Sequence, residues 1–174
     1  GTVLSKGLID KVYDKLKMLD ITLITDEIYE HYIYDDHQHY SLMSEHAEKE
    51  NIISIYSLSK GYGLTGIRVG YIVSNKNTIA TIAPFHHAMN ICAPVNAQYA
   101  SIEALNLNRE WFEVEMKNVI AARQMWMEFL DQLSLPYGIP QGAYYICFDI
   151  SQCQKPAHQV SKDLRSDHQL IINS

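Results

Sequence analysis

Apolar residues recur at helical spacing in several parts of the chain, and each part is expected to form a helix. Residues 6–19 carry an apolar face that is expected to pack against a sheet, with Ser5 as the capping residue: Leu8, Ile9, Val12, Leu16 and Leu19. Residues 76–90 and 96–107 predict two further helices, the first of them short or kinked because Pro84 interrupts it. The longest pattern, over residues 109–133, predicts a long helix with a stripe of core residues: Phe112, Met116, Val119, Ile120, Arg123, Met127 and Leu130.

Short runs of β-branched and apolar residues predict strands between these helices. They span residues 21–25, 52–56, 69–74 and 143–150, and the last of them follows Pro136 and Pro140, which end the long helical pattern. The first run is continuously apolar and follows a helix, which is typical of a buried strand in an α/β sheet. Open α/β sheets bind ligands beyond the carboxyl ends of their strands, so the residues that follow these strands are the first candidates for a functional site.

The composition of the 174-residue chain is that of a globular protein, because 47% of its residues are hydrophobic. A chain of this length buries roughly 70% of the surface that its unfolded form exposes. The net charge of −6 argues against a nucleic-acid partner, since phosphate binding over a wide surface needs a basic face. No apolar run approaches the length of a membrane span and no signal peptide is visible, so we expect a cytoplasmic protein with no membrane partner. Three cysteines without C-x-x-C spacing fit a reducing compartment.

The densest chemical pattern is the stretch SLSKGYGLTGIRVG at residues 57–70, directly after the strand expected at 52–56. Two common motifs overlap it. The G-x-G-x-x-G of dinucleotide-binding folds needs a helix next, whereas residues 67–73 have the pattern of a strand. The S-x-x-K of penicillin-recognising enzymes lacks its companions S-D-N and K-T-G, and the glycines disfavour the helix that it needs. Both interpretations are therefore disfavoured.

The whole pattern S-L-S-K-x-x-G-L-x-G-x-R-V-G resembles the lysine signature of the class I and II aminotransferases, the fold type I family of pyridoxal-phosphate enzymes. The resemblance implies that Lys60 forms a Schiff base with pyridoxal 5'-phosphate and that Arg68 holds the phosphate, with Ser57 and Ser59 as further phosphate contacts. The chemistry fits these roles. A deprotonated amine attacks an aldehyde, and a planar guanidinium donates two parallel hydrogen bonds to a phosphate.

The segment D-E-I-Y at residues 26–29 also resembles this family. The resemblance implies that Asp26 pairs with the pyridine nitrogen of the cofactor and that Tyr29 hydrogen-bonds its 3-hydroxyl. A carboxylate at that place keeps the ring nitrogen protonated, which makes the ring an electron sink. Taken alone, an aspartate after a strand is more often a turn former or a helix cap. Glu27 and Glu30 are expected to face solvent or a dimer partner, without a catalytic role.

Residues 31–50 contain histidines that match no motif of the family: His31, His37, His39 and His46. One interpretation is a metal site, since His37 and His39 are separated by a single residue. The lack of a nearby cysteine or of an H-E-x-x-H helix favours the other interpretation, a surface excursion before the strand at 52–56.

The resemblance implies an α/β fold class, namely the C-terminal half of a fold type I large domain, an α/β/α sandwich, followed by the start of a small α+β domain. The expected division is residues 1–108 for part of the large cofactor-binding domain, 109–133 for a linking helix and 134–174 for the start of the small domain. Gly1 would be the last residue of an N-P-T-G turn of the family, so we expect the chain to be a fragment that lacks the preceding half of the large domain.

The implied function is that of a pyridoxal-phosphate-dependent aminotransferase acting on an amino acid and a 2-oxo acid. Lys60 would release the cofactor to the amino acid and then move a proton as general base. Sites of this family usually form across a homodimer, so a partner subunit is expected. Three alternatives stay open: a related lyase that cleaves C–S bonds, an aminotransferase-like sensor domain of a transcription regulator, and an inert truncated chain that never holds cofactor.

Overall fold

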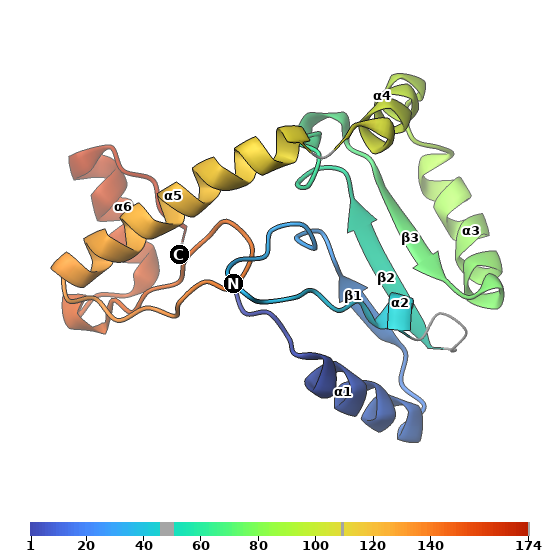
Figure 1. Cartoon of the computed structure of the whole chain (residues 1–174), viewed down its shortest axis with the longest axis horizontal. Helices are drawn as coiled ribbons and strands as arrows, with labels where there is room; N and C mark the ends of the chain where they lie inside the picture. The colour runs from blue at the N-terminus through green and yellow to red at the C-terminus, as the bar shows by residue number, and fades with distance from the viewer. Residues whose placement is uncertain (46–50, 109, 174) are drawn as a thin grey trace.

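The structure is a computed structural model that describes residues 1–45, 51–108 and 110–173. Helices and strands follow one another in an α/β order along the chain (Figure 1). In sequence they are α1 (Lys6–Met18), β1 (Leu23–Asp26), α2 (Leu42–Glu45), β2 (Ile52–Ser57), the 3-10 turn η1 (Thr65–Ile67), β3 (Gly70–Ser74), α3 (Lys76–Asn90), α4 (Val95–Asn106), α5 (Glu110–Gln132), the 3-10 turn η2 (Ser151–Cys153) and α6 (Ala157–His168).

The three strands form one mixed sheet in the order β1-β2-β3. Strands β1 and β2 are parallel, with Leu23 opposite Ile52, whereas β2 and β3 are antiparallel, with Ser57 opposite Gly70. The strands predicted at residues 21–25, 52–56 and 69–74 are confirmed within two residues at either end. Because β1 and β2 run in the same direction, their carboxyl ends lie at the same edge of the sheet.

One face of the sheet carries the hydrophobic core. Ile52 in the central strand is only 1% exposed and packs with residues of α1 and α2: Ile9, Tyr13, Leu42 and Met43. The alternation of buried and exposed positions along β2 identifies this face as the one that the two helices cover.

The opposite face of the sheet carries apolar side chains that remain accessible. Ile24 of β1 is 61% exposed, and on the same face Ile55 of β2 and its cross-strand partner Ile72 of β3 are also exposed. Strands that are apolar on both faces are typical of sheets covered on both sides. This chain therefore covers one side of its sheet more completely than the other.

Helix α1 forms where its pattern predicts, and the Ser5 hydroxyl caps it by accepting from the Leu8 amide at 3.4 Å. Its predicted apolar face is only partly correct. Ile9 packs into the core beside a residue that the prediction left out, Tyr13, whereas Leu8 and Val12 stay exposed. The apolar face of the helix is therefore wider than the surface that the sheet and α2 offer it for packing.

The later helices agree with the sequence pattern. Helix α5 runs from the neighbourhood of α4 at one end to that of α6 at the other (Figure 1), and it buries Phe112 and Leu130 of the predicted stripe. Arg109, the first residue of the helix as predicted, lies outside the described residues. Of the two alternatives predicted for α3, a short helix is wrong, since α3 continues for 15 residues with Pro84 inside it, and the kink stays a prediction. None of the described helices is both long and apolar enough to cross a bilayer.

The prediction of a strand at residues 143–150 is wrong. This segment forms no regular strand and makes a single antiparallel bridge, between Phe148 and Tyr137, while Gly142 just before it bridges Ile33. A strand is stable only when a neighbour satisfies its backbone donors and acceptors. No other described segment lies beside residues 143–150 as a continuous partner, so the β-favouring sequence alone does not make a strand.

The close approach of β2 and β3 at Gly70 makes a testable prediction about stability. A Cβ atom at Gly70 would lie 2.6 Å from the carbonyl oxygen of Tyr56, whereas one at Gly66 would meet no atom within 4 Å. We expect Gly70→Ala to lower the free energy of unfolding by about 1–3 kcal/mol, because backbone must move to admit the methyl group. Gly66→Ala is the matched control. Urea unfolding of the full-length protein measures both, and equal midpoints would refute the close contact.

Candidate cofactor site

A closed loop joins β2 to β3 and carries most of the predicted site residues. The Ser57 hydroxyl at the end of β2 donates to the carbonyl of Val69 at 3.2 Å, and the Leu58 amide donates to the same carbonyl at 3.4 Å. Inside the loop, the Ser59 amide donates to the Ser57 hydroxyl at 3.0 Å. Ser57 and the backbone of Ser59 therefore lie where the loop closes at Val69, the residue after Arg68, at the carboxyl end of β2.

Arg68 adopts a left-handed backbone conformation with φ of 58°. A residue with a Cβ pays roughly 1–2 kcal/mol for this conformation. Its Nη1 donates to the carbonyl oxygen of Thr65 at 2.8 Å, and the Thr65 hydroxyl in turn donates to the Ser59 carbonyl at 2.7 Å. The loop thus holds an exposed guanidinium in one place at the expense of backbone strain, which is common at binding sites.

Lys60 is half-buried among tyrosines. Its Nζ lies 5.3 Å from the ring centre of Tyr144 and 5.9 Å from that of Tyr29. Its backbone carbonyl accepts from the Tyr32 hydroxyl at 3.2 Å and from the Gly63 amide at 3.1 Å. The backbone of the lysine is anchored on one side, while its amine points toward aromatic rings that limit access of water.

The tyrosines around Lys60 differ in acidity. Burial is the main reason that the pKa of Tyr29 lies above its ordinary value, and Tyr144 adds to the effect as a hydrogen-bond partner and as a nearby charge. For Tyr144, burial also opposes ionisation, but contacts with Lys60 and Tyr29 outweigh it and hold the pKa below the ordinary value. Tyr29 therefore keeps its phenolic proton and can donate a hydrogen bond. Tyr144 is a hydrogen-bond partner of the Lys60 side chain. Tyr144 was not predicted as a site residue, because only the fold brings it to Lys60.

Asp26 ends β1 at the same edge of the sheet. In the parallel register it lies opposite Ile55, two residues before Ser57. Its Oδ1 accepts from the amide of Ile28 at 3.2 Å, so the interpretation of Asp26 as a turn former is confirmed. The turn leaves the carboxylate exposed on the face of the sheet that α1 and α2 do not cover.

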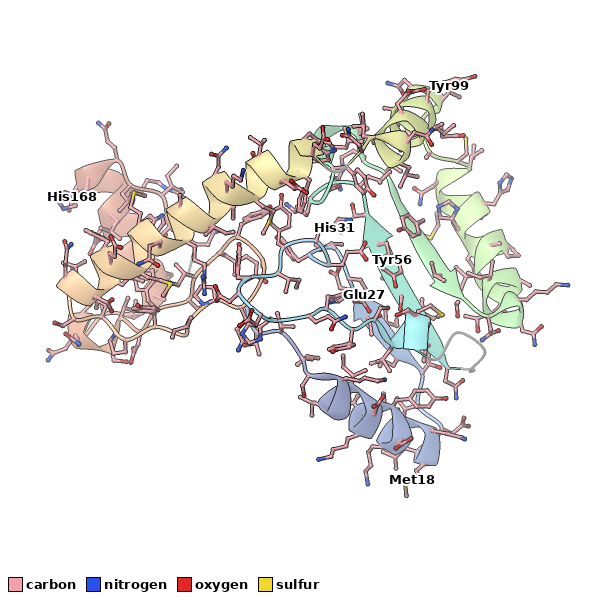
Figure 2. The ribbon with its side chains drawn as sticks, viewed as in Figure 1. Met18, Glu27, His31, Tyr56, Tyr99 and His168 are labelled. Atoms are coloured by element: carbon pink, nitrogen blue, oxygen red, sulfur yellow. The ribbon has the colours of Figure 1, made fainter. Side chains whose placement is uncertain are left out.

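The prediction that Glu27 faces solvent or a dimer partner is wrong, because this side chain is only 7% exposed. Alternation along β1 turns Glu27 toward the core face, opposite to Asp26, and there His39 and the Ser41 hydroxyl contact its carboxylate. His31 is likewise not a simple surface residue, since its ring contacts Phe112 of α5 at 5.7 Å between centres (Figure 2).

The described residues offer no metal site. Across residues 1–45, 51–108 and 110–173, no three His, Cys, Asp or Glu side chains gather closely enough to hold an ion. His46, one of the histidines considered for such a site, lies outside the described residues.

The donors at this edge of the sheet fit one kind of ligand. The guanidinium of Arg68 and the hydroxyls of Ser57 and Ser59 suit a phosphate group. The amine of Lys60 suits a carbonyl carbon, and the carboxylate of Asp26 suits a protonated ring nitrogen. A phosphorylated aromatic aldehyde with a basic ring nitrogen uses all of these groups at once.

Comparisons with known proteins show the family to which the chain belongs. The sequence matches the family described as aminotransferase class I and II over residues 1–174. It is 34% identical over 148 residues to an aspartate aminotransferase of Pyrococcus abyssi, covering 84% of this chain and 38% of that protein. It is 29% identical, over the same shares, to the aromatic-amino-acid aminotransferase 2 of Thermococcus litoralis.

The fold is also shared with solved structures. The crystal structure of an aromatic aminotransferase from Pyrococcus horikoshii superposes with a TM-score of 0.89 at 30% identity, covering 98% of this chain and 46% of the other. The present chain thus spans less than half the length of the relatives that it matches. Its motifs, its α/β architecture and the match along its whole length lead to one conclusion: the chain belongs to the class I and II aminotransferase family.

Proposed function

We propose that these residues form the pyridoxal 5'-phosphate site of an aminotransferase that moves an amino group from an amino acid to a 2-oxo acid. The observation that carries the proposal is the placement of Lys60 and Arg68 on one closed loop after β2, at the sheet edge where β1 ends in Asp26. Pyridoxal phosphate, when bound, supplies an aldehyde for covalent attachment and a ring that takes up electrons.

Each residue of the site has a physical task in this proposal. Lys60 provides the amine that holds the cofactor and later moves a proton at the substrate carbon. Arg68, Ser57 and Ser59 bind the phosphate. Asp26 keeps the ring nitrogen protonated by placing a negative charge beside it.

The phenol of Tyr29 acts as a hydrogen-bond donor to the 3-hydroxyl of the ring. Burial and the contact with Tyr144 raise the pKa of Tyr29, which keeps its proton in place over the whole neutral range of pH. The rings of Tyr29 and Tyr144 beside Lys60 also reduce contact with water, which strengthens the electrostatic interactions within the site.

The wider organisation of the protein belongs to the same proposal. Residues 1–108 form part of the large cofactor domain, residues 109–133 the linking helix and residues 134–174 the start of the small domain. The protein works as a homodimer in the cytoplasm. The relatives extend well beyond the length of this chain, which supports a large domain that continues outside it, and their names support an amino acid as substrate.

The role of Arg68 gives a direct test. Arg68→Ala removes a charged donor to the phosphate, and hydrogen bonds to charged groups contribute about 1.5–3 kcal/mol, so we expect roughly 10- to 100-fold weaker binding of pyridoxal phosphate. Binding of pyridoxal, which lacks the phosphate, should change little. Equilibrium dialysis of the full-length protein with either compound measures both affinities.

Arg165→Ala is the matched control, because Arg165 is an exposed arginine in the last turn of α6, away from the sheet edge. It should bind both compounds as the parent does. If Arg68→Ala kept the parent's preference for the phosphorylated compound, Arg68 would not be the phosphate ligand.

A further inference from the structure

A buried carboxylate lies directly behind the candidate site. The backbone amide of Glu27 donates to the carbonyl of Ile55 at 2.9 Å and so continues the pairing of β1 with β2 by one residue. Its side chain points to the core face, whereas Asp26 before it points to the other face. The two acidic residues are therefore neighbours in sequence with opposite tasks, and only Asp26 has a role in the proposed chemistry.

Polar partners surround the carboxylate of Glu27. The Nε2 atom of His39 lies 2.8 Å from its Oε2, and the Ser41 hydroxyl donates to its Oε1 at 3.3 Å. Ser41 also shares a 2.8 Å hydrogen bond with the Tyr56 hydroxyl on β2, and the Tyr56 ring stacks on Tyr71 of β3 at 5.1 Å. Figure 2 labels Glu27, the residue after β1, and Tyr56 of the neighbouring strand β2. The network therefore ties the end of β1 to the segment at 39–41 and to the other two strands.

The charges in this network support each other. Burial opposes ionisation of Glu27, but contacts with His39, Thr25 and Ser41 outweigh it and hold the pKa of the carboxyl below its ordinary value. The carboxylate of Glu27 raises the pKa of His39, against the effect of burial, and Glu30 adds to the rise. Besides Glu30, the phenol of Tyr56 also faces this pair, and its pKa is raised chiefly by burial.

The ion pair shares a cavity with two residues of the candidate site. A cavity of about 390 Å³ is lined by Glu27 and His39 and also by Asp26 and Tyr29. A tight turn connects the two sets of residues, since the Glu30 amide donates to the Glu27 carbonyl at 3.0 Å. A shift of the Glu27 side chain would therefore move the turn on which Asp26 and Tyr29 sit.

We propose that the ion pair of Glu27 and His39 is a positioning device that holds the turn at residues 26–30 in place, and with it Asp26 and Tyr29. The effect on cofactor affinity rests on the proposed function. The ordering of the turn by the ion pair does not depend on it. Neither Glu27 nor His39 touches the reacting groups in this account, so both are positioning residues and not catalytic ones.

The pair is strongest in a window of pH that the two shifts define. The raised pKa of His39 means that its contribution is complete below the ordinary imidazole value of 6.5 and is lost as the pH rises through the raised value. The lowered pKa of Glu27 means that its contribution is complete above the ordinary carboxyl value of 4.5 and is lost as the pH falls through the lowered value. The turn should therefore be best ordered between these two ordinary values and looser in alkaline solution.

Hydrogen exchange tests the positioning without any cofactor. The full-length protein, freed of pyridoxal phosphate, is compared with His39→Gln and Glu27→Gln at about pH 6 and about pH 8.5, on either side of the histidine titration. His37→Gln is the matched control, since His37 is an exposed histidine two residues from His39. Peptides that contain residues 26–32 are followed by mass spectrometry, with intrinsic exchange rates divided out.

We expect both variants to exchange about tenfold faster than the parent in these peptides at the lower pH, while the control matches the parent. The parent should lose this protection at the higher pH, where the histidine variant should show no further change. Unchanged protection in both variants would overturn the proposal.

Cofactor affinity, measured on the same proteins, tests the consequence. We expect about tenfold weaker binding of pyridoxal phosphate in His39→Gln but not in His37→Gln, which would link the ordering of the turn to the cofactor site. Faster exchange with unchanged affinity would overturn the link to the site. If the parent itself bound no pyridoxal phosphate, the proposed function would fail, and the exchange result would still decide whether the pair orders the turn.

Discussion

Replacing Lys60 by alanine is expected to abolish the covalent attachment of pyridoxal phosphate and with it amino-group transfer. Lys60 is the only amine on the closed loop after β2, and its Nζ lies beside the rings of Tyr29 and Tyr144, which contact each other. Phosphate contacts remain in the variant, so some cofactor should still bind without a covalent bond. Borohydride reduction followed by intact mass measurement of the full-length protein should show the cofactor adduct in the parent and none in the variant.

Lys76→Ala is the control for this experiment, because Lys76 is an exposed lysine at the start of α3, next along the chain after β3. It should form the same adduct as the parent. Normal adduct formation by Lys60→Ala would sink the assignment of the nucleophile.

Asp26→Asn is expected to lower the rate of transamination by about 10²- to 10³-fold, the usual effect of removing one preorganised electrostatic contact to a reacting group. The amide has the shape of the carboxylate and can still accept from the Ile28 amide, so the turn should persist. It has no negative charge, and the ring nitrogen would lose the partner that keeps it protonated. Cofactor should stay attached to Lys60. Single-turnover kinetics with an amino acid, alongside reduction of the adduct, separates the two effects.

Asp36→Asn in the exposed loop after Tyr34 is the matched control. It should leave the rate unchanged. A variant of Asp26 with the parent's rate, or one that had lost its cofactor altogether, would show that Asp26 does not act through the ring nitrogen.

The loop after β2 shows why part of the site could be predicted from sequence. The strand is a mostly apolar, β-favouring run, and the residues with proposed roles extend from its last residue, Ser57, to Arg68, 11 positions further on. Local sequence therefore determines both the strand and the order of donors on the loop. The parallel pairing of β1 with β2 then brings Asp26 to the same edge, as expected for an α/β sheet.

The residues that were missed are those that only tertiary contacts bring together. Glu27 and His39 are 12 positions apart, and neither lies in a motif that specifies a partner. Tyr144 comes from a distant segment and reaches Lys60 because the chain returns to the sheet edge through the bridge between Ile33 and Gly142. Period and spacing within a short window carry no information about such contacts.

The strand expected at residues 143–150 failed for a related reason. Alternating β-branched and aromatic residues describe what a strand needs on its two faces, but strand formation also requires a hydrogen-bonding partner along its edge. The single bridge between Tyr137 and Phe148 is all that the described chain supplies. Likewise, Leu8 and Val12 on α1 match the helical period but stay exposed, because burial depends on the surface opposite.

The most direct test of the central claim is to locate the bond between the protein and its cofactor. The full-length parent protein would be incubated with pyridoxal phosphate, reduced with borohydride and digested for peptide mass mapping. We predict one adduct, on Lys60, in the peptide that also contains Ser57 and Ser59. An adduct on another lysine, or none in a protein shown to be folded, would contradict the account of this site.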